Sequence, residues 1–525
     1  VESGVKHLFS LSGNQILPIY DATIGRDIDI IHTRHEATAV HMADAWGRLT
    51  EEPGIAVVTA GPGHFNGLAA LYMALMAESP LVLLSGHAPI AQLGMGAFQE
   101  VDQVAGALPV TKAAWMVREA ASLGHDINRA MQIACEGRPG PVHLSLPDDI
   151  LREAVDEAVD NANSGGGLES PSGAQEPELD AEKLLERIRS AERPLILAGP
   201  AMARGRRWQV VVDFAAATGT AALPMGSPRG VNDPHLHLAV NKLAEADLVI
   251  LAGKRLDFSL KFGRAPFASD CGFIQIGADA ATGSHIDSML SLVGVPEVIL
   301  REAAKIAREQ APDADRGGWV AAVYDARSQT PEDWHRLCTS TAKPIHPLAV
   351  CAAVQPFLDE GALFVSDGGE FGQWAQAGCE AATRIINGLS GSIGSALPLA
   401  LGTKVIHPER HVFVFVGDGT FGFGALELDT AVRYGLPIIV VIGNDARWNA
   451  EVQLQTNNYG PDRTVACELL PTRYDQVAAA LGAHGERVSD PAQLTPAIER
   501  ALASGLPSCI DVVIEPAPAP SLLSN

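Results

Sequence analysis

Two polar triplets follow two apolar runs of the sequence and have the composition of a site for a metal ion and a phosphate group. Gly417-Asp418-Gly419 ends one run, and Gly443-Asn444-Asp445 ends the next. The glycines let the backbone approach an anion closely, while Asp418, Asn444 or Asp445 and a carbonyl near Arg447 offer the hard oxygen ligands that Mg²⁺ prefers. Gly-Asp-Gly alone is also an ordinary turn, but two such triplets at corresponding positions predict a metal–diphosphate clamp.

The segment that carries the triplets predicts how they are brought together. Val412 to Val416 and Ile438 to Ile442 have the composition of buried strands, and the stretch between them places Leu426, Ala431 and Val432 at helical spacing. A strand, a helix and a second strand form a right-handed parallel unit. Both triplets would then lie at the carboxyl ends of neighbouring strands, where open α/β sheets bind their ligands.

The composition indicates a large globular protein and limits its partners. Of 525 residues, 47% are hydrophobic and 19% are charged, so we expect several domains. The net charge of −24 disfavours binding to nucleic acids or to acidic membrane surfaces, and no apolar run reaches the roughly 18 residues that a membrane span needs. The seven cysteines form no C-x-x-C pair, and no secretory leader is visible at Val1. We therefore expect a reducing, cytoplasmic location without a disulfide or zinc framework.

Apolar runs alternate with helical patterns along the chain, which predicts an α/β protein of three parallel-sheet domains. The first domain spans residues 1–160, the second 178–326 and the third 345–515. Residues 161–177, rich in Gly, Ser and Pro, and the polar stretch from Arg327 to Pro347 predict linkers, and the tail from Pro516 to Pro520 should be extended or disordered. The strands expected in the first two domains are Asp29–His32, Ile55–Thr59, Leu81–Ser85 and Val142–Leu146, followed by Pro194–Gly199, Leu248–Ala252 and Phe273–Ile276.

Glu36 is the second residue with chemical potential. By itself it is an ordinary acidic residue in a first helical turn, where it favours the helix dipole. The motifs that accompany Glu36 suggest a catalytic role, because Arg34-His35-Glu36 belongs to an ordered series of motifs. The others are Gly61-Pro62-Gly63, Ala97 to Asp102, Gly137 to Val142 and Gly391-Ser392-Ile393-Gly394.

From His7 to Pro507 this series resembles the thiamin diphosphate (ThDP)-dependent enzymes of the acetohydroxyacid synthase, benzaldehyde lyase and 2-hydroxyacyl-CoA lyase branch. The clamp resembles the motif of that family, GDG followed by NN, with Asp445 in place of the second Asn. The resemblance implies a pyrimidine-binding domain, a Rossmann-like middle domain and a diphosphate-binding domain. It also implies a site between two subunits, hence at least a homodimer and commonly a homotetramer.

The resemblance also implies roles for single residues. Glu36 matches the acid that hydrogen-bonds the pyrimidine ring of ThDP and relays a proton, while Gln99 and Gln15 match positions that contact the substrate. Gly391 matches the carbonyl that holds the amino group, and Ile393 matches an apolar wedge beneath the cofactor, although it could equally be plain core. Mg²⁺ would be held by Asp418, Asp445 and the backbone oxygen of Arg447. The remaining cofactor contacts would come from Gly61, Gly368, Gly369, Gly417, Gly419, Thr420, Asn444, Trp448 and Asn449.

Three segments bear on which branch member the chain resembles most. Leu17 to Ala22 is similar to acetohydroxyacid synthase. Gly253 to Gly263 is similar to a segment of 2-hydroxyacyl-CoA lyases and oxalyl-CoA decarboxylases that binds CoA or ADP, and Arg447 to Gln453 is similar to benzaldehyde lyase, although that enzyme has a histidine where Asn14 and Gln15 stand. Phosphates in the middle domain would pair with Arg255, Lys261 and Arg264, unless these residues simply form a basic surface loop.

We therefore expect a ThDP- and Mg²⁺-dependent carbon–carbon lyase or carboligase, most like 2-hydroxyacyl-CoA lyase. Its substrates would be a 2-hydroxyacyl-CoA, an aldehyde or a 2-oxo acid, with Asn449 and Glu451 joining the two glutamines at the substrate. The alternative is an acetohydroxyacid synthase, which bound FAD would favour over bound ADP or CoA. A catalytically silent homologue is a third hypothesis, but retention of Glu36, Asp418 and Asn444 argues against it.

Overall fold

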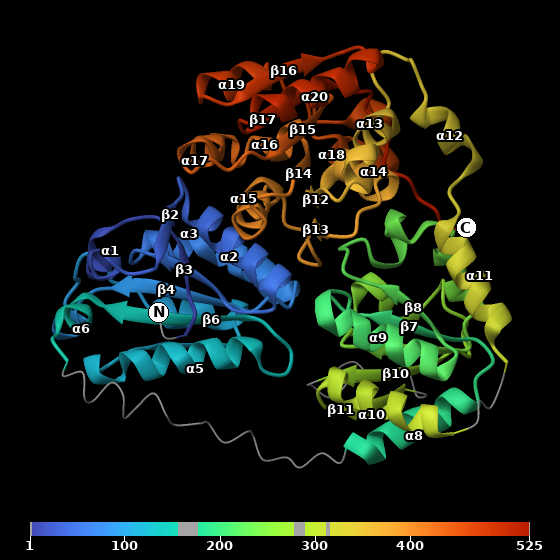
Figure 1. Ribbon diagram of the computed structural model, residues 1–525, viewed down its shortest axis with the longest axis horizontal. Helices are drawn as coiled ribbons and strands as arrows, with labels where there is room; N and C mark the ends of the chain where they lie inside the picture. Colours follow the sequence, from blue (N-terminus) through green and yellow to red (C-terminus); the bar gives the residue numbers. More distant parts are fainter. Residues whose placement is uncertain (1–2, 156–176, 278–288, 311–314, 524–525) are drawn as a thin grey trace.

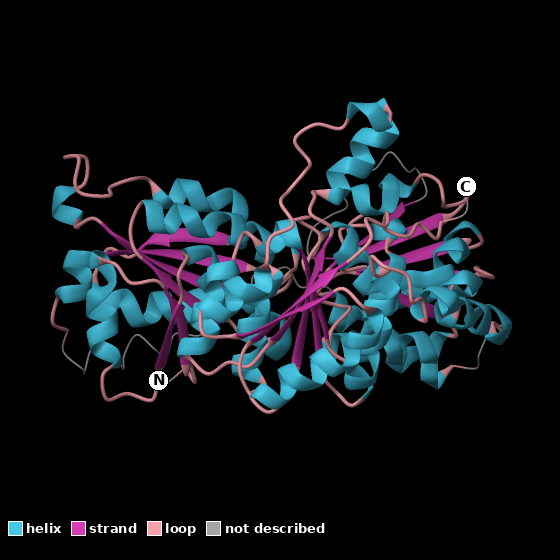
Figure 2. Ribbon diagram, turned by 90° about the horizontal axis from the view of Figure 1, so that it is seen from above, coloured by secondary structure: helices cyan, strands magenta, loops and turns pink. Residues whose placement is uncertain are grey.

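The computed structural model describes residues 3–155, 177–277, 289–310 and 315–523, which form three parallel sheets (Figure 1). Figure 2 shows helices on both sides of the strands, as parallel sheets with two buried faces require. The predicted class, three parallel-sheet α/β domains, is confirmed. Within the described ranges, none of the helices is long and apolar enough to cross a bilayer.

The first sheet has the strand order β2-β1-β3-β4-β6-β5. The four strands predicted for this domain are present, and β1 and β5 are additions. Its strands are β1 (His7–Ser10), β2 (Asp29–His32), β3 (Gly54–Val58), β4 (Leu81–His87), β5 (Ala113–Met116) and β6 (Pro141–Pro147). Its helices are η1 (Asn14–Ile16), α1 (Leu17–Thr23), α2 (Glu36–Thr50), α3 (Pro62–Met76), α4 (Gln103–Ala107), η3 (Leu108–Val110), α5 (Leu123–Cys135) and α6 (Asp148–Arg152).

The middle sheet has the order β11-β10-β9-β7-β8. Its strands are β7 (Pro194–Ala198), β8 (Ala221–Pro224), β9 (Leu248–Ala252), β10 (Gly272–Gly277) and β11 (Met289–Val293). Its helices are α8 (Pro177–Arg189), α9 (Gly205–Thr218), η6 (Pro234–Ala244), η7 (Phe258–Gly263), α10 (Pro296–Glu309) and α11 (Gly317–Ser328). Apart from Pro177, which begins α8, the predicted linker 161–177 lies outside the described residues.

The third sheet has the order β13-β12-β14-β15-β17-β16. Numbered within its own domain, this order is the same as that of the first sheet. Its strands are β12 (Leu363–Ser366), β13 (Arg384–Ile386), β14 (Val412–Gly417), β15 (Ile439–Asn444), β16 (His484–Val488) and β17 (Ser508–Val513). Its helices are α13 (Pro347–Asp359), α14 (Gly369–Gly378), α15 (Ala396–Ile406), α16 (Asp418–Phe421), η8 (Ala425–Glu427), α17 (Leu428–Arg433), α18 (Asn449–Tyr459), α19 (Tyr474–Ala480) and α20 (Leu494–Ser504).

The first and third domains share one apolar core, which runs through helices α2 and α15. The two helices lie side by side in Figure 1. They approach closely at Gly402, where a Cβ atom would lie only 2.7 Å from the Met42 carbonyl and 2.9 Å from the Ala45 Cβ. A larger residue at position 402 would therefore push apart the helix that begins at Glu36 and the domain that carries the clamp.

Two expectations about local structure are wrong. The stretch from Arg327 to Pro347 is not a plain linker, because it contains helix α12 (Glu332–Cys338), which buries Trp334 against α13 and α14. The segment after Asp418 is not one amphipathic helix. It is broken into α16, η8 and α17, and Leu426 is 55% exposed instead of facing the core.

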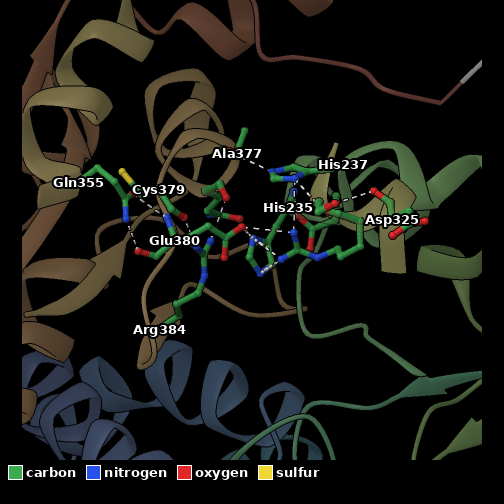
Figure 3. Close-up of polar contacts among 12 residues, drawn as sticks. His235, His237, Asp325, Gln355, Ala377, Cys379, Glu380 and Arg384 are labelled. Atoms are coloured by element: carbon green, nitrogen blue, oxygen red, sulfur yellow. Dashed lines mark hydrogen bonds and ion pairs between the residues drawn. The ribbon is translucent and has the colours of Figure 1, made fainter. Parts of the chain in front are cut away.

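Helix α14, which begins at the predicted cofactor residue Gly369, is anchored at its other end by basic side chains (Figure 3). Arg384 donates to the carbonyl of Gln376 at 2.9 Å and also to that of Cys379. From the middle domain, a ring nitrogen of His237 lies 3.0 Å from the Ala377 carbonyl oxygen. These contacts satisfy carbonyls left free at a helix C-terminus, and the charge of Arg384 complements the helix dipole.

The C-terminal tail crosses from the third domain to the middle domain. Residues 516–520 form neither helix nor strand, in agreement with the prediction of an extended tail. The Ala519 N–H donates to Glu370 at the start of α14, and the Leu522 carbonyl accepts from Asn241 at 3.2 Å. Leu522 and Leu523 pack against the core of the middle domain.

Candidate active site

The carboxyl edge of the third sheet brings the two predicted triplets together. Gly417 pairs with Gly443 across β14 and β15, so Asp418 and Asp445 follow neighbouring strands. Burial raises the pKa of Asp418 to about 6. Burial, and then the nearby charge of Asp418, raise the pKa of Asp445 to about 7. A bound cation would relieve this repulsion.

The residues present fit a magnesium ion shared with a phosphate. Asp418 is only 2% exposed, and its Oδ2 has no hydrogen-bond partner within the described part of the chain. The described residues contain no group of three His, Cys, Asp or Glu side chains suited to a metal. Two carboxylates would thus need backbone oxygens, such as that of Arg447, and ligand phosphate to complete the coordination that Mg²⁺ prefers.

The loop after Asp445 is held in a fixed shape. Ala446 has a left-handed backbone, with φ of 57°, and its carbonyl accepts from the Leu469 N–H at 2.7 Å. The Trp448 N–H donates to the Cys467 carbonyl at 2.7 Å. A returning segment therefore positions the carbonyl of Arg447 and the indole of Trp448.

Trp448 lies directly on the glycine that follows Asp418. A Cβ atom at Gly419 would come within 2.7 Å of the indole ring, so only glycine fits there. The Phe423 ring meets the indole edge-to-face at 6.3 Å and also covers Gly394. Thr420 is buried, and its hydroxyl donates to the Gly417 carbonyl at 3.0 Å.

Asp367, which sequence analysis missed, accepts hydrogen bonds from the backbone of two further glycines at this edge, Gly368 and Gly394. Its Oδ1 accepts from the N–H groups of Gly368 and Gly394, at 2.8 and 3.2 Å, and its Oδ2 accepts from Ala396 at 3.0 Å. Burial raises the pKa of Asp367 even though these donors favour its charged form. The strand-end rule that found Asp418 would also have found Asp367, because it follows the buried strand β12.

Asp367 therefore draws the segment that holds Gly391 and Ile393 toward Gly368. Gly391 is exposed with φ of 68°. Ile393 is half-buried, and its Cγ2 lies 3.4 Å from where a Gly368 Cβ would stand. Gly369, at φ of 77°, begins α14 beside them.

Two predicted cofactor residues use their side-chain amides within the protein. Asn444 donates to the Asp511 carboxylate at 2.8 Å and to the Thr472 carbonyl at 3.0 Å, which fastens the strand end to β17. The amide oxygen of Asn449 accepts from Gln453 at 3.1 Å, and its nitrogen donates to the Ala517 carbonyl at 3.4 Å. Both residues lie at the predicted edge, and their amides hold the loop and the tail there.

Glu36 lies at the carboxyl edge of the first sheet as the first residue of α2. It is 8% exposed, and its Oε2 accepts from the Asn66 amide at 3.0 Å. A Cβ atom at Gly63 would lie 3.3 Å from the other carboxylate oxygen, Oε1, so glycine leaves that oxygen accessible to a ligand.

The two predicted glutamines also lie at this edge. Gln15 is 6% exposed, and its amide oxygen accepts from Thr59, the residue after β3, at 2.6 Å. Gln99 has a left-handed backbone, with φ of 60°, and packs on Gly61, where a Cβ atom would lie 2.8 Å from the Gln99 carbonyl. A hollow of about 390 Å³ beside them is lined by Gly61, Pro62, Phe65, Gln99, Glu100 and Val101.

Gln103, also missed by sequence analysis, holds the turn at Gly61 in place by hydrogen bonds. It is 1% exposed; its oxygen accepts from the Gly61 N–H at 2.8 Å, and its nitrogen donates to the Gly86 carbonyl at 3.1 Å. It thereby fixes the turn on which Gln99 rests. No pattern in the sequence distinguishes it from an ordinary helical glutamine.

A second cleft lies between the first and middle domains, at the carboxyl ends of β7, β9 and β10. Arg255 lines it, whereas the predicted Lys261 and Arg264 lie outside its lining. Its cavity volume is only about 40 Å³, so an occupant of nucleotide size would extend beyond it into solvent. The charged side chains in the lining are Arg138, Arg207, Lys254 and Arg255 with Glu78 and Glu297.

Comparison with known families assigns all three domains. The chain matches the thiamine pyrophosphate enzyme N-terminal TPP binding domain over residues 1–105, the central domain over 181–303 and the C-terminal TPP binding domain over 367–512. These matches cover both sheet edges described above.

Named relatives match the chain over most of its length. Acetolactate synthase large subunit IlvG of Mycobacterium tuberculosis is 34% identical over 100% of this chain and 95% of its own. The human protein named 2-hydroxyacyl-CoA lyase 2 is 31% identical over 92% of this chain and 82% of its own. A probable acetolactate synthase large subunit of Methanocaldococcus jannaschii is 27% identical over 98% and 90%. The chain belongs to the thiamine pyrophosphate enzymes, and its two outer domains imply thiamin diphosphate as the cofactor.

Proposed function

We propose that the protein is a ThDP- and Mg²⁺-dependent carbon–carbon lyase or carboligase that interconverts a 2-hydroxyacyl-CoA with an aldehyde and formyl-CoA. In the cleavage direction, the bond between the carbinol and acyl carbons breaks. The hydroxyl group loses its proton to become the aldehyde, and the acyl carbon gains a proton. The observation that carries the cofactor requirement is the pair formed by the buried Asp418 and the partly buried Asp445, which a divalent cation would neutralise.

The chain's own residues would divide the work between the two edges. When bound, ThDP supplies a nucleophilic carbon and accepts the electron pair of the bond that breaks. Glu36 would hold a proton at the pyrimidine ring nitrogen and orient that ring. Gln99 and Gln15 would bind the substrate oxygen, and Asn449 and Glu451 would complete the substrate contacts from the third domain.

The basic side chains of the cleft beside the middle sheet favour a CoA substrate. Four basic and two acidic side chains line this cleft, and guanidinium and ammonium groups suit nucleotide phosphates. Lys254 is buried and pairs with Asp257 at 2.7 Å, and Arg138 pairs with Glu78 at 2.7 Å. Arg207 pairs with Glu297 at 3.5 Å and with Glu51 at 3.7 Å. Carboxylates thus hold three of the four basic side chains in place, where the phosphates of ADP or CoA would bind.

We propose further that two copies build each active site, within a homodimer or a homotetramer. Large apolar side chains are exposed around the Gln99 loop: Met95 is 76% exposed, Phe98 70% and Leu108 55%. On helix α3 beside them, Phe65 is 43% exposed. Apolar surface of this kind marks an interface, and a second copy seated there would bring its Asp418 toward Glu36. A protein that is active under conditions in which light scattering shows only a monomer would contradict this arrangement.

Reconstitution of the apoprotein tests the reaction. With ThDP and Mg²⁺, we expect cleavage of mandelyl-CoA to benzaldehyde and formyl-CoA. The tertiary alcohol 2-hydroxyisobutyryl-CoA would give formyl-CoA and a ketone, acetone, in place of an aldehyde. Omission of either ThDP or Mg²⁺ is the control and should abolish turnover. No product across a panel of 2-hydroxyacyl-CoA substrates would reject this substrate class.

A second candidate is an acetolactate synthase, which joins two 2-oxo acids after decarboxylation. It is favoured by the relatives that carry this name, one of which matches the chain end to end at 34% identity. Pyruvate is therefore the second substrate to assay. Acetolactate formation together with no cleavage of acyl-CoA, especially by a yellow protein with bound FAD, would establish this candidate instead.

A further inference from the structure

The turn that leads into Glu36 is held by the third domain of the same chain. It joins β2 to α2 and spans residues 32–36. The His32 carbonyl accepts from Arg433 at 2.8 Å, and its N–H donates to the Tyr434 hydroxyl at 2.8 Å. That hydroxyl donates in turn to the Ile30 carbonyl at 3.2 Å. The end of β2 is therefore fixed by side chains more than 400 positions away in the sequence.

Glu427 holds the turn closer to Glu36 than these residues do. Its two carboxylate oxygens accept from the Arg34 N–H at 3.1 and 3.3 Å. One of them also accepts from the Thr430 hydroxyl at 2.6 Å. Glu427 is only 2% exposed. A buried carboxylate is tolerated only while it is hydrogen-bonded, so the Arg34 amide and Glu427 stabilise each other.

We propose that Glu427 is a positioning residue, which places Glu36 by fixing the backbone two residues before it. Glu36 is the first residue of α2, and His35 caps this helix by accepting from the Ala37 N–H at 3.1 Å. A displacement of Arg34 is therefore transmitted directly to the helix start. The inference rests on the proposed function, in which the Glu36 carboxylate must meet the pyrimidine ring.

The segment that contains Glu427 also contains Asp418 of the metal–diphosphate clamp. Glu427 ends η8, on the broken segment that begins with Asp418 and continues into α17. One segment of the third domain therefore presents the metal-binding carboxylate at its start and holds the turn of Glu36 at its end. If each site forms between two copies, this segment connects one site of the dimer to the other.

Hydrogen exchange of the apoprotein tests the positioning role without any cofactor. In Glu427→Ala, the peptide that contains Arg34 should exchange its amides about 10-fold faster, since a protecting acceptor is lost. Glu427→Gln keeps an acceptor oxygen for Arg34 and should retain most of the protection. Glu486→Ala is the matched control, because Glu486 pairs with Arg500 at the far edge of the same domain and should leave the turn unchanged.

Exchange of the thiazolium C2 proton tests the catalytic consequence. With bound ThDP and Mg²⁺, this rate should fall about 10- to 100-fold in Glu427→Ala, as expected for misplacement of a catalytic group. Glu427→Gln should restore most of it. The KM for the substrate and the ThDP affinity should change by less than about threefold, because the metal–diphosphate clamp and the two substrate glutamines are left in place.

The possible results separate the two proposals. The positioning role would be overturned if the Arg34 amide of a folded Glu427→Ala protein exchanged its hydrogen at the wild-type rate. It would also be overturned if this amide exchanged faster while the C2 proton exchanged at the wild-type rate. Wild-type protein that fails to bind ThDP with Mg²⁺ would overturn the proposed function instead, whatever the amide shows. Should Glu427→Ala not fold, Tyr434→Phe provides the second variant. It removes the hydroxyl that holds His32, and it should show the same pair of effects more weakly.

Discussion

The first and third sheets have the same strand order, but their carboxyl edges differ in whether the carboxylate oxygens have hydrogen-bond partners. At the first edge, Glu36 and Gln15 are buried and hydrogen-bonded to Asn66 and Thr59. At the third edge, Asp418 keeps an unpartnered oxygen, and burial together with repulsion raises the pKa of Asp445 to about 7.

This difference indicates different tasks. An edge whose polar side chains are already held by hydrogen bonds is preorganised, and it can orient a ligand without rearrangement. An edge with one buried and one partly buried carboxyl group side by side is incomplete by itself and is stabilised by the cation that it binds. One fold, used twice, thus supplies a positioning surface and a metal-binding surface.

Substitution of Asp418 should have the largest effect on cofactor binding, and it tests whether the third edge is the metal-binding one. Asp418→Ala should weaken Mg²⁺-dependent ThDP binding by roughly 100-fold or more, because a direct ligand is lost at a site where even indirect contacts matter 10- to 100-fold. The apoprotein should melt at the same temperature or higher, since a repelling buried carboxyl is removed. Titration calorimetry and thermal melting measure the two quantities.

Asp445→Asn is the matched variant for this test, since it keeps an oxygen ligand while removing the second charge. Its cofactor affinity should fall less than that of Asp418→Ala. Undiminished ThDP binding by Asp418→Ala would mean that the third edge is not the metal site.

Substitution of Glu36 should affect turnover while sparing binding. Glu36→Gln should reduce kcat by about 100- to 10,000-fold, the usual contribution of an acid–base group, with ThDP affinity changed only a few-fold. Steady-state kinetics and cofactor titration check this. A variant that retains the wild-type rate, or one that loses ThDP as Asp418→Ala does, would remove the distinction between the two edges.

The sequence was sufficient for the parts of the site that follow from strand ends. Asp418 and Asp445 were found because each follows an apolar run, and parallel strands of one sheet present their carboxyl ends together. The same reasoning gave the parallel α/β class. Glu36 could be singled out only from the motifs around it, since an acidic first-turn residue is common.

The sequence did not reveal contacts between domains or competition for polar groups. Nothing local indicates that Glu427 reaches Arg34 in another domain, or that Asp511 occupies the amide of Asn444. The break of the helix after Asp418 was also missed, because Leu426 fits a helical period although it is exposed. Resemblance and charge likewise grouped Lys261 and Arg264 with Arg255, whereas only Arg255 lines the cleft; Lys261 lies in η7 and Arg264 directly after it.

The interior of the first sheet offers a finer test, because it buries histidines instead of carboxyl groups. The rings of His64 and His143 lie 4.5 Å apart, and no partner within the described residues reaches either ring nitrogen of His143. Burial lowers the pKa of His143 well below its usual 6.5 and that of His64 to about 4. Below pH 6.5 these two histidines are therefore protonated in the unfolded chain but stay neutral in the folded chain. The free energy of unfolding falls as the pH drops.

His143→Leu should remove two unpartnered buried nitrogens at nearly constant volume and stabilise the apoprotein by about 1 kcal/mol at pH 7.5. The advantage should grow toward pH 5.5, because the variant lacks one group that the unfolded wild type protonates. Urea denaturation followed by tryptophan fluorescence at both pH values measures it, with the half-buried His407→Leu as the control. ThDP affinity should not change, since His143 is fully buried within β6 and is not exposed to a ligand. A destabilised variant with the wild-type dependence on pH would show instead that His143 is hydrogen-bonded in solution, and that the interior of the first domain is as fully paired as its edge.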